Sequence, residues 1–335
     1  MSALEQLNAE VGIPLDELLQ TVEAALADAY KRAFAPPGEI SVRLDPETGT
    51  LEVSSRVLGA DGAESVTRLP AEEFLRLAAQ TARAAVMRHI RELERDRALR
   101  EVSERRGELV TGAVDRVEAG TVYVDLGKAE GVMPPDEQIP GEVVHPGRPL
   151  TVVVLEAQRS PRRAQVRVSR ASRLFVHRLL EAEVPELASG AVQVRAIARE
   201  PGLRTKVAVS STQPGIDPVG ACVGPKGIRH RSLLSELGGE HVDIVPWSED
   251  PPRFVAAALG PASVLEVKVD RATRTASVVV PRAQLSLAIG RDGQNARLAA
   301  KLTGWRIDIK PAAEDGAQPP HKPHSPSDAG SRDPG

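Results

Sequence analysis

Hydrophobic residues recur at helical spacing over the first thirty residues of the chain. Residues three and four positions apart lie on one face of a helix, so this segment predicts an amphipathic helix pair or one bent helix that ends at Pro36-Pro37-Gly38. Apolar and polar residues then alternate at 40–44 and 51–53 around a Pro-Glu-Thr-Gly turn, which predicts a β-hairpin. The apolar positions of the helical segment are Leu4, Leu7, Val11, Leu15, Leu18, Leu19, Val22, Ala25, Leu26 and Tyr30.

A long polar helix is predicted to follow the hairpin, from Pro70 to about Arg105. Its second half is dense in arginine and acidic residues. Opposite charges three and four positions apart stabilise a solvated helix face. The same charges would suit a rigid arm or a surface that docks a partner, and the sequence leaves both interpretations open. The charged residues are Arg91, Glu92, Glu94, Arg95, Asp96 and Arg97.

Between residues 107 and 170 the pattern changes to short valine-rich segments separated by glycine turns. Five short strands at such spacing are typical of a small β-barrel. The predicted strands are 108–117, 121–126, 131–133, 150–156 and 164–169.

The chain repeats itself between Leu174 and Lys310. In each half a helix is followed by two strands, an apolar helix, two glycines three residues apart, a second helix and a last strand. The first helix of the first half is expected at 175–187. Two α-β-β-α-α-β units in tandem account for the pattern. The glycine pairs are Gly224-Pro225-Lys226-Gly227 and Gly290-Arg291-Asp292-Gly293.

These patterns together predict an α+β multidomain protein. It has an α/β N-terminal domain, a β-barrel, two repeated units and a tail. The tail holds six prolines among small polar residues and is expected to be disordered. The predicted domains are 1–105, 106–172, 173–249, 250–310 and, for the tail, 311–335.

The composition excludes several classes of protein. With 335 residues, 41% of them hydrophobic and no long apolar run, the chain is expected to be a multidomain protein with no membrane span. Its one cysteine, Cys222, excludes an internal disulfide and a cysteine-clustered metal site, and is expected to be a small buried hydrophobe. The N-terminus shows no secretory signal. We therefore expect a cytoplasmic protein without metal or cofactor.

The net charge of −3 hides an uneven distribution. Residues 1–105 carry 13 Lys and Arg against 19 Asp and Glu, a net charge of −6. Residues 271–310 carry 8 against 2, a net charge of +6. A cationic block inside an acidic chain is the electrostatic pattern that attracts a phosphate backbone.

Each glycine pair of the repeat lies between an apolar helix and a helix that starts at once. Glycine allows a sharp turn and a close approach of the backbone to a ligand, and the N–H groups of the next helix favour a phosphate. Nearby arginines and lysines add positive charge. This arrangement predicts binding of single-stranded nucleic acid by its phosphates. The alternative is that the glycines only cap helices, and Asp292 could cap the next helix.

The predicted RNA-binding residues come from both loops and from the barrel. Tyr123 is the only aromatic residue of the barrel and could either stack on a base or lie half in the core. Trp247 and Trp305 are expected to pack at a domain seam. The predicted set is Gly224, Pro225, Lys226, Gly227, Arg229, Arg231, Gly290, Arg291, Asp292, Gly293, Gln294, Arg297, Lys301 and Tyr123.

Three stretches of the chain, 217–224, 245–250 and 284–305, resemble the NusA family of bacterial transcription elongation, termination and antitermination factors. The tandem units look like prokaryotic-type KH domains and the barrel like an S1-type OB-fold, and the resemblance covers residues 1 to about 310. It implies an N-terminal domain that docks on RNA polymerase near the RNA exit channel. It also implies that the S1 and KH modules bind the nascent transcript, with effects on pausing, termination and antitermination. The tail stands where some members of the family carry acidic repeats, so autoinhibition through such repeats is not expected.

The expected partners are RNA polymerase, nascent single-stranded RNA and other transcription factors, with the chain itself a monomer and not an enzyme. An RNA-processing enzyme is the first alternative, but it needs a catalytic body. The only Gly-Lys step, Gly127-Lys128, continues into Ala129 and forms no phosphate-binding loop of the nucleotide-hydrolysing type. A ribosomal or RNA scaffold protein is the second alternative, and the acidic first domain, which would repel phosphate, argues against it.

Overall fold

The computed structural model describes residues 13–313, apart from 47, 59–63, 159 and 161–163. The start of the predicted N-terminal helix and all but three residues of the predicted tail lie outside the described residues. The chain separates into two compact units, Met1–Pro135 with His145–Val168, and Asp136–Val144 with Ser169–Gly335. The finer division into four folded domains stays a prediction.

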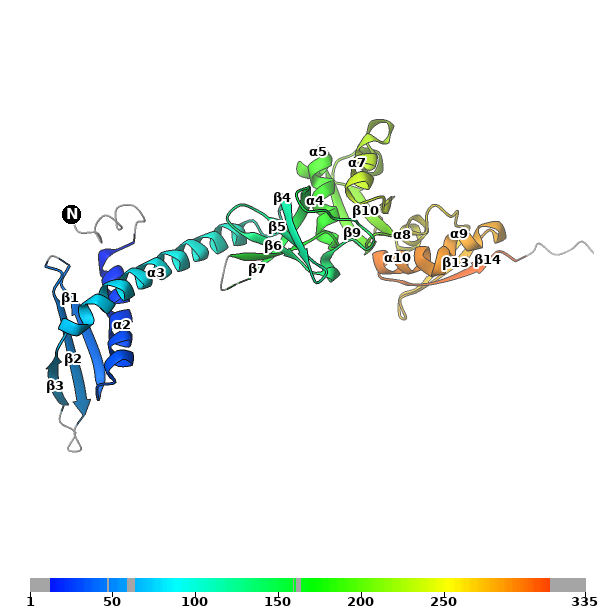
Figure 1. Ribbon diagram of the computed structural model, residues 1–335. Helices are drawn as coiled ribbons and strands as arrows, with labels where there is room; N and C mark the ends of the chain where they lie inside the picture. Colours follow the sequence, from blue (N-terminus) through cyan, green and yellow to red (C-terminus); the bar gives the residue numbers. More distant parts are fainter. Residues whose placement is uncertain (1–12, 47, 59–63, 159, 161–163, 314–335) are drawn as a thin grey trace, which may run out of the picture. The chain divides into compact units, whose positions relative to one another are not determined.

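The first unit begins with a three-stranded antiparallel sheet, in the order β1-β2-β3, against which two helices pack (Figure 1). Val42 and Val53 pair across β1 and β2 and are buried beneath both helices. The Tyr30 hydroxyl donates to the Pro70 carbonyl oxygen at 3.0 Å, which ties the first helix to the start of the second. The elements are α2 (Leu15–Phe34), β1 (Glu39–Leu44), β2 (Leu51–Leu58), β3 (Glu64–Leu69) and α3 (Leu75–Glu104).

Strand β3 was missed by the sequence-based prediction, which contained a two-stranded hairpin only. It pairs with β2, yet all its side chains except that of Leu69 are exposed. An edge strand that buries almost nothing carries no alternation of apolar residues to detect. In α3, Arg97 and Glu101 form an i,i+4 ion pair at 3.3 Å on the solvated face.

A closed five-stranded barrel completes the first unit, with the strand order β4-β5-β6-β8-β7. Only β6 and β8 run parallel, and the other neighbours are antiparallel. This is the order of an OB-fold, and valines alternate into its interior, among them Val122, Val124, Val166 and Val168. The strands are β4 (Leu109–Glu118), β5 (Thr121–Asp125), β6 (Glu130–Met133), β7 (Pro149–Gln158) and β8 (Gln165–Ser169).

The second unit holds the two repeated α-β-β-α-α-β modules, here called the first and second KH modules. In each sheet the middle strand is antiparallel to the first strand and parallel to the last. The elements of the first are α4 (Arg173–Glu183), α5 (Pro185–Ala188), β9 (Val192–Glu200), β10 (Arg204–Ser211), α6 (Pro218–Val223), α7 (Ile228–Glu236) and β11 (His241–Pro246). Those of the second are α8 (Pro251–Ala258), β12 (Glu266–Asp270), β13 (Thr275–Val280), α9 (Leu285–Ile289), α10 (Gln294–Thr303) and β14 (Arg306–Pro311).

The single helix predicted at 175–187 is wrong, since α4 and α5 are separate. Val184 has φ −119° and ψ 98°, an extended conformation between the two helices. It precedes Pro185, whose ring disfavours the helical conformation in the residue before it.

The two KH modules share one apolar core rather than merely adjoining. Ala198, Ala208 and Val245 of the first lie in the same buried cluster as Phe254 and Leu298 of the second. A polar contact joins them as well, because the buried Lys206 ammonium donates to the Gly260 carbonyl oxygen at 2.8 Å and to Asp243 at 2.9 Å. Burial lowers the pKa of Lys206, and Asp243 opposes that effect. The modules therefore form one body.

Both tryptophans pack against this shared core, as the sequence predicts. The Trp247 ring meets the Phe254 ring edge-on with centroids 6.4 Å apart. The Arg195 guanidinium lies 4.2 Å from the Trp247 ring centroid, so Trp247 makes a cation–π contact within the protein in addition to its contact with Phe254.

Among the described residues, no helix is both long and apolar enough to cross a lipid bilayer.

Candidate nucleic-acid interface

The two glycine pairs form loops of nearly the same backbone conformation, here called the first glycine loop (224–227) and the second glycine loop (290–293). Gly224 and Gly290 have φ of 72° and 76°, each with ψ of 170°. The last glycines, Gly227 and Gly293, have φ of 71° and 72°. These conformations lie in the left-handed half of backbone space, where glycine is favoured.

The first glycine of each loop also lacks space for a side chain. A Cβ on Gly224 would lie 2.7 Å from the Arg229 Cγ, and one on Gly290 would lie 2.8 Å from the backbone nitrogen of Asn295. A Cβ on Gly293 would have none of the described atoms that surround it within 4 Å. Glycine is therefore required by space and conformation at the start of each loop, and by conformation alone at Gly293.

The loops lead into helices α7 and α10, whose N-terminal residues, Gly227 and Gly293, have no side chain to cap the helix. N–H groups in the first turn of a helix are unpaired within the helix and carry partial positive charge, so they suit a phosphate. Asp292 was considered as a cap for α10, and this is wrong because no side-chain cap bond is formed there. Its carboxylate is exposed, 3.8 Å from Arg291.

The glycines also fulfil the alternative role of closing the preceding helices. The Gly224 N–H donates to the Gly220 carbonyl oxygen at 2.9 Å, and the Gly290 N–H donates to that of Ser286 at 2.8 Å. Capping of α6 and α9 and the start of a helix with no side-chain cap, α7 or α10, are thus both present in the same loops.

In the first glycine loop the predicted cations have different surroundings. Lys226 and Arg231 are exposed, and Arg231 Nη1 donates to the Lys226 carbonyl oxygen at 2.7 Å. Arg229 is half-buried, and its Nη1 donates to the Ala221 carbonyl oxygen at 2.6 Å and to Glu186 at 2.9 Å. Arg229 therefore holds the loop against its own module, while Lys226 and Arg231 face solvent.

At the second glycine loop two of the three predicted cations, Arg297 and Lys301, converge on a carboxylate of the first module, whereas Arg291 is exposed beside Asp292. Arg297 Nη1 donates to the Asp292 carbonyl oxygen at 3.2 Å, while its Nε and Nη2 donate to Glu200 at 2.7 and 3.1 Å. Gln294 Nε2 donates to the same carboxylate at 3.1 Å, and the Lys301 ammonium lies 3.8 Å from it. The hydrogen bond from Arg297 and then that from Gln294 lower the pKa of Glu200 to about 2, although burial opposes the shift.

Two residues that bear on this site were missed by the sequence-based prediction, Glu200 and Asn295. Asn295 is buried, and its Nδ2 donates to the carbonyl oxygens of Leu259 and Ala288, each at 3.0 Å. It occupies the position in the second loop that Arg229 has in the first, five residues after the first glycine, so aligning the repeats would have found it. No local signal marks Glu200, which lies 97 residues from Arg297.

Exposed apolar side chains accompany both loops. Ile228 follows the first loop, and Leu287 and Ile289 precede the second. Nucleic-acid bases have apolar faces, so such side chains beside a phosphate site provide surface for unstacked bases.

Tyr123 belongs to the other unit, in the barrel. The Arg116 guanidinium lies 3.8 Å from its ring centroid, held there by ion pairs to Asp115 and Glu130, each at 2.7 Å. Hydrogen bonds from Arg116 to these acids raise the pKa of the guanidinium further. One face of Tyr123 is thus covered by a cation of the chain, and at most the other face could receive a base.

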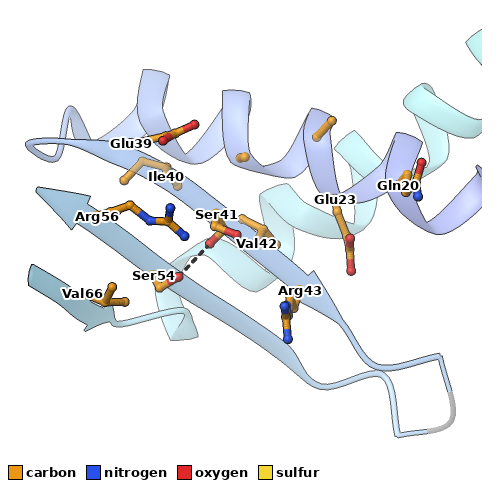
Figure 2. Close-up of a pocket in the computed structure, with 12 residues that line it drawn as sticks. Gln20, Glu23, Glu39, Ile40, Ser41, Val42, Arg43, Ser54, Arg56 and Val66 are labelled. Atoms are coloured by element: carbon orange, nitrogen blue, oxygen red, sulfur yellow. Dashed lines mark hydrogen bonds between the residues drawn. The ribbon is translucent and has the colours of Figure 1, made fainter. Parts of the chain in front are cut away.

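A polar hollow in the first unit lies between α2 and the N-terminal sheet (Figure 2). Glu23, Glu39, Arg43 and Arg56 line it, and Glu23 accepts a hydrogen bond from the Leu44 N–H at 2.9 Å. Mixed acids and bases give no bias toward an anionic ligand, so we do not assign the hollow to the nucleic-acid interface.

Family models match three segments of the chain. Residues 1–60 match the NusA N-terminal domain, residues 170–247 the NusA-like first KH domain and residues 251–316 the NusA-like second KH domain. Each glycine loop lies within one of the matched KH segments.

Relatives named transcription termination/antitermination protein NusA match the chain over nearly its whole length. The Mycobacterium bovis protein is 42% identical over 342 residues, covering 99% of this chain and 97% of the relative. The Bacillus subtilis protein is 40% identical, covering 92% and 90%, and that of Thermus thermophilus 38%, covering 93% and 89%. With identity at this level over nine tenths of its length, the chain belongs to the NusA family.

Proposed function

We propose that this chain is a transcription factor that binds nascent single-stranded RNA through the two glycine loops while its N-terminal domain is docked on RNA polymerase. The observation that carries the RNA-binding half is the occurrence, twice in one compact unit, of the same loop conformation ahead of a helix with no side-chain cap. Family membership supports the polymerase half.

Phosphates are expected to contact the loop N–H groups and the cations around them. In the first loop these cations are Lys226 and Arg231, and in the second Arg291, Arg297 and Lys301. Arg229 and Gln294 act indirectly, through the contacts that hold each loop. Asp292 contributes through its backbone, and Pro225, which has no N–H, contributes by restricting the backbone conformation at the start of the first loop. Tyr123 adds at most one stacking face.

Tethering explains why contacts of modest strength suffice. A protein bound to polymerase presents its RNA-binding surface at a high effective concentration to the emerging transcript. Binding there changes the folding and the release of the transcript, which is how such a factor alters pausing, termination and antitermination. The function requires no cofactor and no catalytic step, and we propose that the chain acts as a monomer in the cytoplasm together with other elongation factors.

The experiment for RNA binding is an anisotropy titration of a labelled, unstructured RNA with the full chain at several salt concentrations. We expect the logarithm of the binding constant to fall linearly with the logarithm of salt concentration, by roughly 0.7 per phosphate neutralised. Association independent of salt would contradict the phosphate contacts.

Two further measurements separate the competing functions. Co-purification with polymerase subunits supports the proposal, whereas ribosomal subunits would favour an RNA scaffold. Incubation with labelled RNA and a divalent metal should leave the RNA intact, and turnover in proportion to the protein would favour an RNA-processing enzyme.

A further inference from the structure

Arg297 joins three parts of the second unit. Its Nη1 bonds the carbonyl oxygen of Asp292, inside the second glycine loop, while Nε and Nη2 hold both carboxylate oxygens of Glu200. Glu200 is the last residue of β9, in the first KH module. The conformation of the second loop is therefore connected through one side chain to the sheet of the other module.

Among the described residues, Arg231 beside the first glycine loop makes no corresponding contact across the modules. Arg231 bonds the carbonyl oxygen of Lys226 just as Arg297 bonds that of Asp292. Within the part of the chain that the structure describes, no carboxylate lies within ion-pair distance of Arg231. The two loops are alike in backbone and differ in what holds their arginine.

We propose that Glu200 is a positioning residue for RNA binding at the second glycine loop, because it fixes the guanidinium of Arg297 beside that loop from the first KH module. The inference rests on the proposed RNA-binding function. Arginine has five N–H donors. The bonds to Asp292 and Glu200 use each of its three nitrogens once, which leaves two hydrogens for a phosphate. The Arg297 side chain is 47% exposed, so a ligand can reach it.

The Glu200 carboxylate also cancels positive charge at the second glycine loop, and this effect opposes the binding of a phosphate. Glu200 faces two cations, Arg297 at 2.7 Å and Lys301 at 3.8 Å. The cluster thus keeps a net positive charge that attracts phosphate. The bidentate contact with Glu200 already restricts the rotamers of Arg297 in the free protein. Less conformational entropy is then lost when RNA binds, and such preorganisation raises the affinity for RNA. Glu200 itself is held in place, since its side chain is 17% exposed and its strand pairs with β10.

The test uses the full chain and an unstructured RNA long enough to contact both loops, titrated over a range of salt. We expect Glu200→Gln to weaken binding several-fold and to reduce the salt slope by about 0.7, the value for one lost phosphate contact, even though the substitution removes a negative charge. Glu266→Gln is the matched charge control, because its carboxylate lies on an exposed strand and pairs with Lys268. It should leave affinity unchanged or slightly increased.

Coupling between the two residues gives a second measurement. Arg297→Gln should weaken binding as much as Glu200→Gln, and the double variant should be no weaker than either. Arg297→Lys keeps the charge but cannot clamp both carboxylate oxygens and the loop carbonyl together, so it should also weaken binding. Thermal unfolding of each variant shows whether the fold is kept. If Glu200→Gln does not fold, the RNA affinity of Arg297→Lys still tests the proposal.

Three results would overturn the proposal. They are tighter binding with a steeper salt slope in Glu200→Gln, additive effects of the two substitutions, and wild-type affinity in Arg297→Lys. If the proposed function itself is wrong, the wild-type chain will not bind RNA at all in the same titration.

Discussion

Arg231 and Arg297 occupy equivalent positions in helices α7 and α10, which follow the two glycine loops, and each braces its loop in the same way. Arg231 Nη1 donates to the Lys226 carbonyl oxygen at 2.7 Å, and Arg297 Nη1 donates to that of Asp292 at 3.2 Å. In both loops the accepting residue has φ of 51°, a conformation that L-residues seldom adopt. The bracing bond thus stabilises the least favourable backbone residue of each loop, and it does so with a side chain whose charge suits a phosphate.

Replacing the cations of the first loop should weaken RNA binding to different extents. Lys226→Ala removes a point charge, whereas Arg231→Ala removes a charge and the brace on the loop, so we expect the larger loss for Arg231→Ala. Each substitution should lower the salt slope by roughly 0.7 in an anisotropy titration. Lys268→Ala is the matched control, a lysine on an exposed strand of the second module. Equal losses in all three variants would mean that only overall charge matters.

The two glycines of the second loop should differ in their tolerance of alanine. Gly293→Ala costs the left-handed conformation, roughly 1–2 kcal/mol of unfolding free energy. Gly290→Ala carries that cost and also an overlap with the backbone nitrogen of Asn295, so it should be clearly more destabilising. Denaturant unfolding measures the difference. Equal destabilisation would show that the space around Gly290 adjusts freely.

Asn295 should be intolerant of the change to aspartate. Its Nδ2 donates to two buried carbonyl oxygens, and Asn295→Ala removes both hydrogen bonds at a cost of about 1–3 kcal/mol, although the Leu259 oxygen still accepts from the Ala262 N–H. Asn295→Asp should be worse, because a carboxylate would face the same oxygens without a hydrogen to donate. Thermal unfolding ranks the variants, and an aspartate variant more stable than the alanine variant would contradict this account.

The ion pair of Glu200 should lose its effect on stability in acid. The pKa of Glu200 is lowered to about 2 in the folded chain, so its stabilising contribution is full above the pKa of the unfolded chain and is lost as pH falls toward 2. The difference in unfolding free energy between the wild type and Glu200→Gln should therefore be constant near neutral pH and shrink below about pH 4.5. A difference that stays constant down to pH 2 would contradict the assignment.

Cys222 should be inert toward thiol reagents while the chain is folded. It is buried, and burial raises its pKa to about 11, which leaves little thiolate at pH 8. Labelling with an aromatic disulfide reagent should be slow in buffer and fast in denaturant. Fast labelling of the folded chain would show that α6 opens readily and that the thiol is accessible to reagents.

The repeat and the loops were predictable from sequence because the information is local. In each half the two strands, the helix before the glycine pair, the helix after it and the last strand follow one another in the predicted order. Strand β3 and the break at Val184 were not predicted. Strand β3 buries almost no side chain, and apolar residues continue at helical spacing across Pro185, from Leu180 through Val184 to Leu187.

What each charged residue does was decided by the tertiary structure. From the order of residues alone it follows that cations lie next to two helix starts without a side-chain cap, since glycine spacing and helix boundaries depend on neighbours along the chain. The sequence could not separate Arg229, which is bonded to Glu186, from the exposed Arg231 two residues later. Nor could it pair Glu200 with Arg297. An ion pair across 97 residues depends on how two sheets and a shared core pack, and that packing has no local signature.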